Sequence, residues 1–204
     1  MARVSVLLWD IGGVILSNGW DEADRLAAAK KFSLDAEEFE RRHALVIADF
    51  ETGRIDDEQY LSTTVFYVPR PFSRAAFQKF MRNCSVPLPS PLATARALGA
   101  RGAYVMAALN NESAALNRYR ITTFRLTEIF DFFLSSCYTG RRKPDPDAYL
   151  YALEITQRAP EEILFLDDRL DNVKAAERLG LPTLWVQDPA RLREDLAAAG
   201  VTTR

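Results

Sequence analysis

The 204-residue chain contains very little cysteine and histidine. Its two cysteines, Cys84 and Cys137, lie far apart and form no CxxC pair, which excludes a disulfide scaffold or a zinc ribbon and is typical of a reducing compartment. The single histidine, His43, excludes a metal site made of several histidines. No apolar run approaches the roughly 18 residues of a membrane span, so we expect no membrane partner.

The chain also has almost no excess of charge of either sign. Lysine and arginine number 26 and aspartate and glutamate 28, which gives a formal net charge of −2. This balance excludes a strongly basic nucleic-acid binder, and the basic stretch Arg141–Lys143 is too short for such a surface. Because no signal-peptide-like segment precedes the first predicted strand, we expect a cytoplasmic protein. Nothing in the sequence indicates an oligomeric state.

Short apolar runs typical of buried strands occur at Val4–Trp9, Ala103–Leu109, Phe132–Ser135, Ile163–Leu166 and Thr183–Val186. Helical patterns separate or follow them at Ser90–Ala100, Ser113–Tyr119, Thr123–Phe130, Pro146–Thr156, Asp171–Leu179 and Ala190–Ala199. Strands that alternate with helices form parallel sheets covered on both faces. We therefore predict an α/β fold with a Rossmann-like, doubly wound parallel sheet.

The interval between the first two predicted strands is much longer than one crossover helix requires. Four further helices are predicted there, near Asp21–Lys31, Asp35–Phe50, Asp57–Tyr67 and Ser73–Asn83. Acidic residues at their starts, such as Asp35 and Asp56, suit helix N-termini. We predict an inserted all-helical cap domain at residues 16–88 and a core made of residues 1–15 and 89–204.

Polar residues stand where the predicted strands end. They are Asp10 after the first strand, Asn110 and Asn111 after the second, Lys143 soon after the third, and Asp167 and Asp168 after the fourth. Ligands of open parallel sheets bind beyond the carboxyl ends of the strands, so we expect these side chains to meet at one edge.

Three carboxylates that meet at one edge need compensating charge. A hard divalent cation with oxygen ligands supplies it, and a site of this size suits Mg²⁺. Three aspartates and one Mg²⁺ sum to −3 + 2 = −1, and Lys143 brings the total to zero, so a phosphate dianion can enter without net repulsion. Asn110 and backbone N–H groups would then hold the phosphoryl oxygens. The set therefore predicts phosphoryl chemistry.

At these positions the sequence resembles the haloacid dehalogenase-like (HAD) superfamily, in its branch with a helical cap. The four segments that resemble its motifs, in order, are Trp9–Ile15, Ala108–Ser113, Gly140–Pro146 and Leu164–Asn172. The segment Glu51–Ile55 resembles a loop often seen in the cap, and Asn110 stands where serine or threonine is usual. The resemblance covers essentially the whole chain and implies a hydrolase acting on a small phosphorylated metabolite.

The resemblance implies a role for each matching residue. Asp10 would be the nucleophile that becomes an aspartyl-phosphate, and Lys143 would neutralise its charge and that of the phosphate. Asn110, Asn111 and Lys143 would bind the phosphate. The implied metal ligands are Asp10, the backbone carbonyl of Gly12 and Asp168. Asp167 and Asn172 would lie next to these ligands without binding the metal directly.

The departure at Gly12 leaves several readings open. Most phosphatases of the superfamily carry a second aspartate there as general acid and base, and losing such a group costs roughly 3–5 kcal/mol of barrier. The substrate then needs a good leaving group, as a sugar 1-phosphate has; glucose-1-phosphate phosphatases of this branch resemble the chain in having glycine. Alternatively, a cap residue such as Glu51 or Asp49 supplies the proton.

Other functions also fit the sequence. One alternative is a phosphoryl-ligand-binding or regulatory protein with weak or lost catalysis. A weaker one is metal-independent dehalogenation, which the Asp167–Asp168 pair disfavours. In the cap, Glu51 and Arg54 are tentative substrate contacts, and His43 is expected to pack within the cap or lie on its surface.

Overall fold

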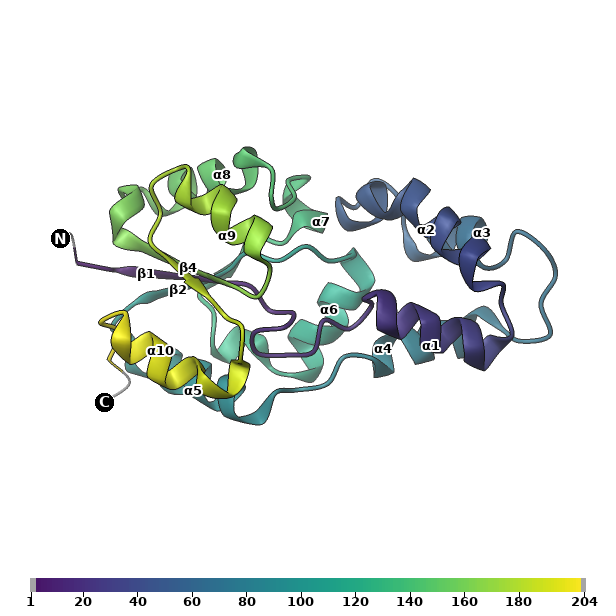
Figure 1. Ribbon diagram of the computed structural model, residues 1–204, viewed down its shortest axis with the longest axis horizontal. Coiled ribbons are helices and arrows are strands. Elements are labelled where there is room, and N and C mark those ends of the chain that lie inside the picture. Colours follow the sequence, from purple (N-terminus) through teal and green to yellow (C-terminus); the bar gives the residue numbers. More distant parts are fainter. Residues whose placement is uncertain (1–2, 203–204) are drawn as a thin grey trace.

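The computed structural model describes residues 3–202, and a five-stranded parallel sheet lies at its centre (Figure 1). The strands are β1 (Val6–Trp9), β2 (Val105–Ala108), β3 (Phe132–Phe133), β4 (Ile163–Asp167) and β5 (Thr183–Trp185). Their order across the sheet is β3-β2-β1-β4-β5. Strand β1 is central and pairs in register with β2 and β4, from Val6 opposite Val105 and Ile163 to Trp9 opposite Ala108 and Leu166. The ends of β1 and β4 therefore lie side by side.

Helices cover both faces of the sheet (Figure 1). Side chains alternate between faces along a strand, so Leu7 and Trp9 pack with helices α5 (Pro89–Arg101) and α10 (Leu192–Ala198). Leu8 faces the other way and packs with α8 (Pro146–Thr156) and α9 (Leu170–Glu177). This arrangement confirms the predicted Rossmann-like α/β sheet.

One predicted helix, Thr123–Phe130, is wrong. Helix α6 (Ala114–Thr123) continues past the predicted end and then stops, because Arg125 adopts a left-handed φ of 53°. A single 3₁₀ turn, η1 (Leu126–Glu128), follows. The short elements α7 (Ser136–Thr139), η2 (Pro160–Glu162) and η3 (Pro189–Arg191) complete the core.

Four helices form a separate body beyond one end of the sheet (Figure 1). They are α1 (Glu22–Phe32), α2 (Ala36–Glu51), α3 (Asp57–Thr64) and α4 (Arg74–Asn83). As expected from the sequence, Asp35 and Asp56 are N-caps; the Asp56 side chain accepts from the Gln59 N–H in a full capping box. The helices enclose their own aromatic core, in which Phe39 and Phe77 are buried, and this confirms the helical cap.

The two connections between core and cap run side by side. Ser17 donates from its backbone N–H to Val86 (2.7 Å), and Leu88 donates to Ile15 (3.0 Å). The boundaries 1–15, 16–88 and 89–204 stay a prediction, and their outermost residues, 1–2 and 203–204, lie outside the described part. Among residues 3–202, no helix combines the length and apolar character that crossing a membrane requires.

Candidate functional site

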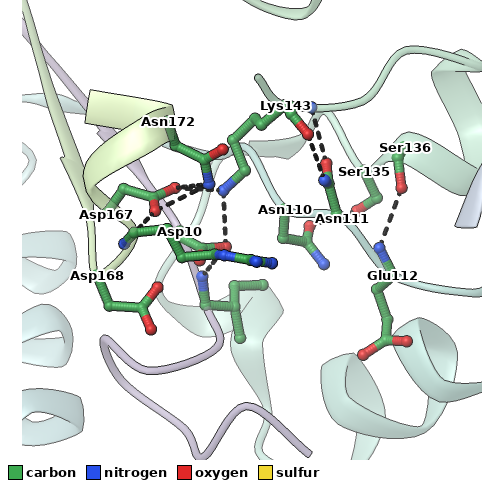
Figure 2. Close-up of polar contacts among 12 residues, drawn as sticks. Asp10, Asn110, Asn111, Glu112, Ser135, Ser136, Lys143, Asp167, Asp168 and Asn172 are labelled. Atoms are coloured by element: carbon green, nitrogen blue, oxygen red, sulfur yellow. Dashed lines mark hydrogen bonds and ion pairs between the residues drawn. The ribbon is translucent and has the colours of Figure 1, made fainter. Parts of the chain in front are cut away.

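The centre of the site is a buried lysine between two buried aspartates (Figure 2). Lys143 Nζ lies 2.9 Å from Asp10 Oδ1 and 2.6 Å from Asp167 Oδ2. Asp10 follows β1 and Asp167 ends β4, and the pairing of these strands brings the two carboxylates together. Lys143 reaches them from the loop before α8, which has Asp145 as its N-cap and begins at Pro146, as the sequence predicts.

Asp167 and Asp168 have different surroundings, although they are neighbours in the chain. Asp167 is fully saturated: Asn172 Nδ2 donates to both of its oxygens at 3.0 Å, and the Arg169 backbone N–H donates at 2.8 Å. Asp168 has one weak contact, at 3.4 Å from Asn18 Nδ2 to Oδ2. Its Oδ1 is buried and finds no hydrogen-bond donor within the described residues. Asp168 therefore offers a free, buried acceptor.

The electrostatics of this cluster are those of an acidic site with insufficient positive charge. Burial raises the pKa of Asp10 to about 7; Lys143 opposes this shift, whereas Asp167 and Asp168 add to it. Burial and the charge of Asp167 likewise raise the pKa of Asp168. Burial lowers the pKa of Lys143, but Asp10 and Asp167 outweigh burial and the net pKa is raised. Lys143 is therefore charged at neutral pH.

These residues fit a divalent cation. Asp10, Asp167 and Asp168 each place a carboxylate oxygen within 4.8 Å of the others. Three carboxylates and one ammonium sum to −3 + 1 = −2, which one divalent ion balances. The donors are hard oxygens, which Mg²⁺ prefers, and the unpartnered oxygen of Asp168 has a use in such a site.

Asn110 belongs to a closed ring of hydrogen bonds beside the cluster. Its Oδ1 accepts from the Ser135 hydroxyl (2.8 Å), its Nδ2 donates to Asn117 (3.1 Å), and Asn117 donates to Ser135 (3.0 Å). The ring fixes the amide of Asn110 and leaves one of its N–H groups free to donate. Asn110 lies at the cavity, as a phosphate ligand would.

Asn111 holds the backbone that carries Lys143 (Figure 2). Its Nδ2 donates to the Lys143 carbonyl (2.8 Å), and its Oδ1 accepts from the Lys143 N–H (3.0 Å). This two-point contact aims the lysine at the aspartates. A phosphate-binding role for Asn111 stays a prediction. Both the Oδ1 and the Nδ2 of its side chain already form hydrogen bonds with the backbone of Lys143.

The space beside Gly12 is occupied by Asn18. A Cβ at position 12 would lie 3.1 Å from Asn18 Oδ1, a tight contact. A Cβ at Gly13, whose φ is +69°, would overlap the Asp168 carboxylate at 2.2 Å. The turn after β1 thus lies directly against the acidic cluster, and a side chain at position 12 requires Asn18 to move.

Core and cap enclose one cavity of about 510 Å³ at this edge of the sheet. The core contributes Asp10, Lys143 and Asp168, and the cap contributes Trp20, His43 and Phe50. Sequence analysis did not identify Trp20 or His43 as cavity residues. A helical pattern shows which face of a helix is apolar, but not whether that face meets a core or a cavity.

The two tentative cap contacts lie in different places. Glu51 lines the cavity and pairs with Arg142 of the core at 2.6 Å; burial raises its pKa and Arg142 opposes the shift. Its carbonyl also accepts from Ser136 of α7 (2.6 Å). Arg54 pairs with Asp49 at 3.1 Å, its side chain is 69% exposed, and it does not line the cavity.

Arg120, which sequence analysis missed, joins core and cap from α6. Its buried guanidinium lies 3.2 Å from Glu112, donates to Ser85 (3.0 Å) and contacts the carbonyl of Asn18. Gly19 has φ +71°, and a Cβ there would lie 1.9 Å from Arg120 Nη2, so only glycine leaves room. Burial raises the pKa of Glu112 to about 7 against the effect of Arg120.

The chain is similar to known proteins in sequence and in fold. A family described as haloacid dehalogenase-like hydrolase matches residues 4–180. Flavin mononucleotide hydrolase 1 of Arabidopsis thaliana is 29% identical over 79% of this chain and 65% of its own length. A sesquiterpene phosphatase of Aspergillus oryzae is 25% identical over 89% of both chains. Bifunctional epoxide hydrolase 2 of Rattus norvegicus is 38% identical over 35% of this chain, but the match spans 13% of that protein.

Solved structures show the same fold. A HAD family enzyme of Bacteroides thetaiotaomicron superposes with a TM-score of 0.77 at 22% identity, covering 90% of this chain and 94% of that one. Its complex with magnesium and inorganic phosphate superposes with a TM-score of 0.74, at 22% identity and 89% and 93% coverage. Because the family match extends over most of the sequence, this chain belongs to the haloacid dehalogenase-like hydrolases.

Proposed function

We propose that the protein is a Mg²⁺-dependent phosphatase that hydrolyses a small phosphorylated metabolite, a sugar phosphate among the candidates, through an aspartyl-phosphate on Asp10. The strongest support is the grouping of Asp10, Lys143, Asp167 and Asp168 at one end of a shared cavity. Two relatives are named as a flavin mononucleotide hydrolase and a sesquiterpene phosphatase, and a similar structure was solved with magnesium and inorganic phosphate.

In this function Asp10 attacks phosphorus and the ester oxygen leaves with the alcohol. Lys143 stays protonated and offsets the charge of Asp10 and of the phosphate. Asn110 donates its free N–H to a phosphoryl oxygen, and water then hydrolyses the aspartyl-phosphate and restores Asp10. Asp10, the Gly12 carbonyl and Asp168 would hold Mg²⁺, with Asp167 and Asn172 behind them. The ion, when bound, supplies positive charge beside the transferred group.

The lack of a carboxylate at Gly12 restricts the substrates that the enzyme would hydrolyse efficiently. Without a general acid at this position, the leaving alcohol receives little protonation as the bond breaks. Esters with good leaving groups, such as sugar 1-phosphates, tolerate this loss best. Glu51 stays a second candidate for the missing acid, because it lines the cavity and burial raises its pKa.

The direct test is phosphate release from aryl and sugar phosphates with Mg²⁺ and with EDTA. We expect release only with Mg²⁺, and Asp10→Asn should lower it by at least about 10³-fold, since the nucleophile is lost. Asp171→Asn, an exposed carboxylate outside the cavity, is the matched control. Equal activity in EDTA, or full activity of the Asp10→Asn protein, would contradict the proposal.

The same experiment distinguishes a phosphatase from a protein that only binds phosphoryl ligands. No turnover over a broad panel, together with Mg²⁺-dependent binding of beryllofluoride, would identify a phosphoryl-binding protein instead. The cytoplasm stays our prediction for its location, on the scarcity of cysteine.

A further inference from the structure

Three cap residues form a chain of hydrogen bonds beside the cavity. Trp20 Nε1 lies 2.9 Å from the Tyr60 hydroxyl, and the same hydroxyl lies 2.8 Å from His43 Nδ1. Tyr60 is fully buried and stacks on Phe50, with ring centroids 4.0 Å apart. The chain therefore has one geometry, held by packing on both sides.

The direction of these hydrogen bonds follows from the groups involved. The indole N–H of Trp20 can only donate, so the Tyr60 oxygen accepts from it. Donation of the single Tyr60 proton to His43 Nδ1 satisfies both groups, whereas the reverse direction would leave that proton with neither of these two partners. His43 Nδ1 is therefore unprotonated, and the proton of the neutral imidazole lies on Nε2.

The protonated nitrogen is free to reach the cavity. His43 lines it and is 7% exposed. Nε2 has no hydrogen-bond partner in the part of the chain that the structure describes, and it is not among the fully buried polar atoms that lack one. His43 thus presents one N–H donor to the cavity that also contains Asp10 and Lys143.

The cap wall around this donor carries little free positive charge. Arg25 forms a two-point pair with Glu40 (2.7 and 2.8 Å) and donates to the Trp20 carbonyl. His43 itself is neutral, because burial and the charge of Arg25 lower its pKa to about 4, with Glu40 opposing them weakly. Such a wall suits an uncharged polar group better than a second anion.

We propose that His43 is a specificity-determining residue whose Nε2–H donates to an oxygen on the leaving group. This inference rests on the proposed phosphatase function. It selects phosphate esters whose leaving group carries an uncharged acceptor, such as the hydroxyl or ring oxygen of a sugar or polyol. Tyr60 and Trp20 are positioning residues, since they act through the imidazole.

Kinetics with two variants test the donor. In His43→Asn the amide can still accept from Tyr60 but has no group at the Nε2 position, whereas in His43→Gln the longer side chain returns an N–H there. The ratio of kcat/KM for a hexose 1-phosphate to that for phenyl phosphate, which has no such oxygen, should fall about tenfold in His43→Asn. The loss should appear mainly in KM, and His43→Gln should recover part of it.

Leu45→Asn is the matched control, because Leu45 is exposed on the same helix. It should leave the ratio unchanged. An unchanged ratio in His43→Asn, or equal loss on both esters, would overturn the role of His43 while leaving the phosphatase function intact. No turnover of any ester by the unmodified protein would instead refute the proposed function and the inference with it.

The tautomer can be measured without turnover. His43 is the sole histidine of the sequence, so ¹⁵N-histidine labelling of the untagged protein gives signals from one imidazole. At pH 7 we expect the proton on Nε2, and the Nε2 resonance should move when a hexose 1-phosphate binds to Asp10→Asn protein. A proton on Nδ1, or an Nε2 resonance that stays fixed under saturating ligand, would refute the assignment.

Discussion

The core side and the cap side of the cavity differ in how far their charged groups are paired. On the core wall, three aspartates share one lysine and Asp168 keeps a buried oxygen without a donor among the described residues. On the cap wall, Arg25 is matched by Glu40, and His43 is neutral. The core cluster therefore needs one divalent cation to be balanced, whereas Arg25 and His43 leave no unmatched positive charge on the cap wall, which Asp21 and Glu22 also line.

We therefore expect the core side to carry the reaction and the cap side to recognise the substrate. An unbalanced buried cluster is costly in the empty protein, but it binds the groups that complete it. The paired and neutral groups of the cap wall cost little and contribute shape and directed hydrogen bonds. The following predictions test this contrast.

The largest effect is expected from Lys143→Met, which removes the cation from the core wall. Asp10 and Asp167 then repel each other without compensation, so we expect a loss of about 3–5 kcal/mol in the free energy of unfolding without Mg²⁺. Phosphate release should be lost as well. Urea unfolding measures the first effect, with Lys79→Met, an exposed lysine on α4, as control. Equal stability of both variants would mean that the core wall is already balanced.

Arg120 lies at the junction of the two walls, and its removal should cost slightly less. Arg120→Met leaves Glu112 buried without its cation, and we expect a loss of about 3 kcal/mol in urea unfolding. Arg118→Met is the control, since Arg118 is exposed two residues away on α6. A difference below about 1 kcal/mol would show that Glu112 is neutral without the arginine.

The neutral state of His43 predicts a dependence on pH. The imidazole pKa is about 4 in the folded protein and 6.5 in the unfolded chain, so only the unfolded chain binds the proton between these values. The contribution of His43 to stability should therefore fall by about 3 kcal/mol as the pH drops from about 6.5 to 4, whereas Asp10 and Glu112, whose pKa values burial raises to about 7, change stability in the opposite direction. Urea unfolding of the unmodified protein and of His43→Asn at pH 7 and pH 4.5 isolates this contribution, because the unmodified protein should lose more stability, or gain less, than the variant. The same change in both proteins would mean that His43 does not contribute.

The smallest effect is expected outside the cavity. Arg54 is exposed and its pair with Asp49 lies in water, so Arg54→Ala should change stability by less than about 1 kcal/mol and leave KM unchanged. Glu51→Gln, which weakens the pair with Arg142 at the cavity, should alter KM. A larger change in KM from Arg54→Ala than from Glu51→Gln would reverse our placement of the cap loop.

The sequence predicted the core wall better than the cap wall, for a physical reason. Carboxyl ends of parallel strands lie at the same edge of a sheet, so Asp10 and Asp167 were expected at one edge, and the pairing of β1 with β4 brings them together. The amide role of Asn111 depends on the path of a distant loop, which no local pattern contains. The prediction of a helix at Thr123–Phe130 was wrong because Arg125 adopts a left-handed backbone conformation. Arginine rarely adopts this conformation, so the sequence gives no sign of it.

The cap shows more clearly what local sequence patterns do not predict. Its four helices follow from N-caps and apolar spacing, but the spacing does not show that His43 faces a cavity and not the aromatic core. That outcome depends on Tyr60, which belongs to another helix and supplies the partner for Nδ1. Arg120 was missed because its partners lie in the two connections, up to about a hundred positions away in the sequence.

The position of Arg120 has a mechanical consequence. The chain crosses between its two bodies twice, and a single guanidinium contacts both crossings, at Asn18 and at Ser85. The two crossings are therefore held to each other through one side chain, in addition to their own backbone hydrogen bonds. Any displacement of one crossing relative to the other would break the arginine's contacts.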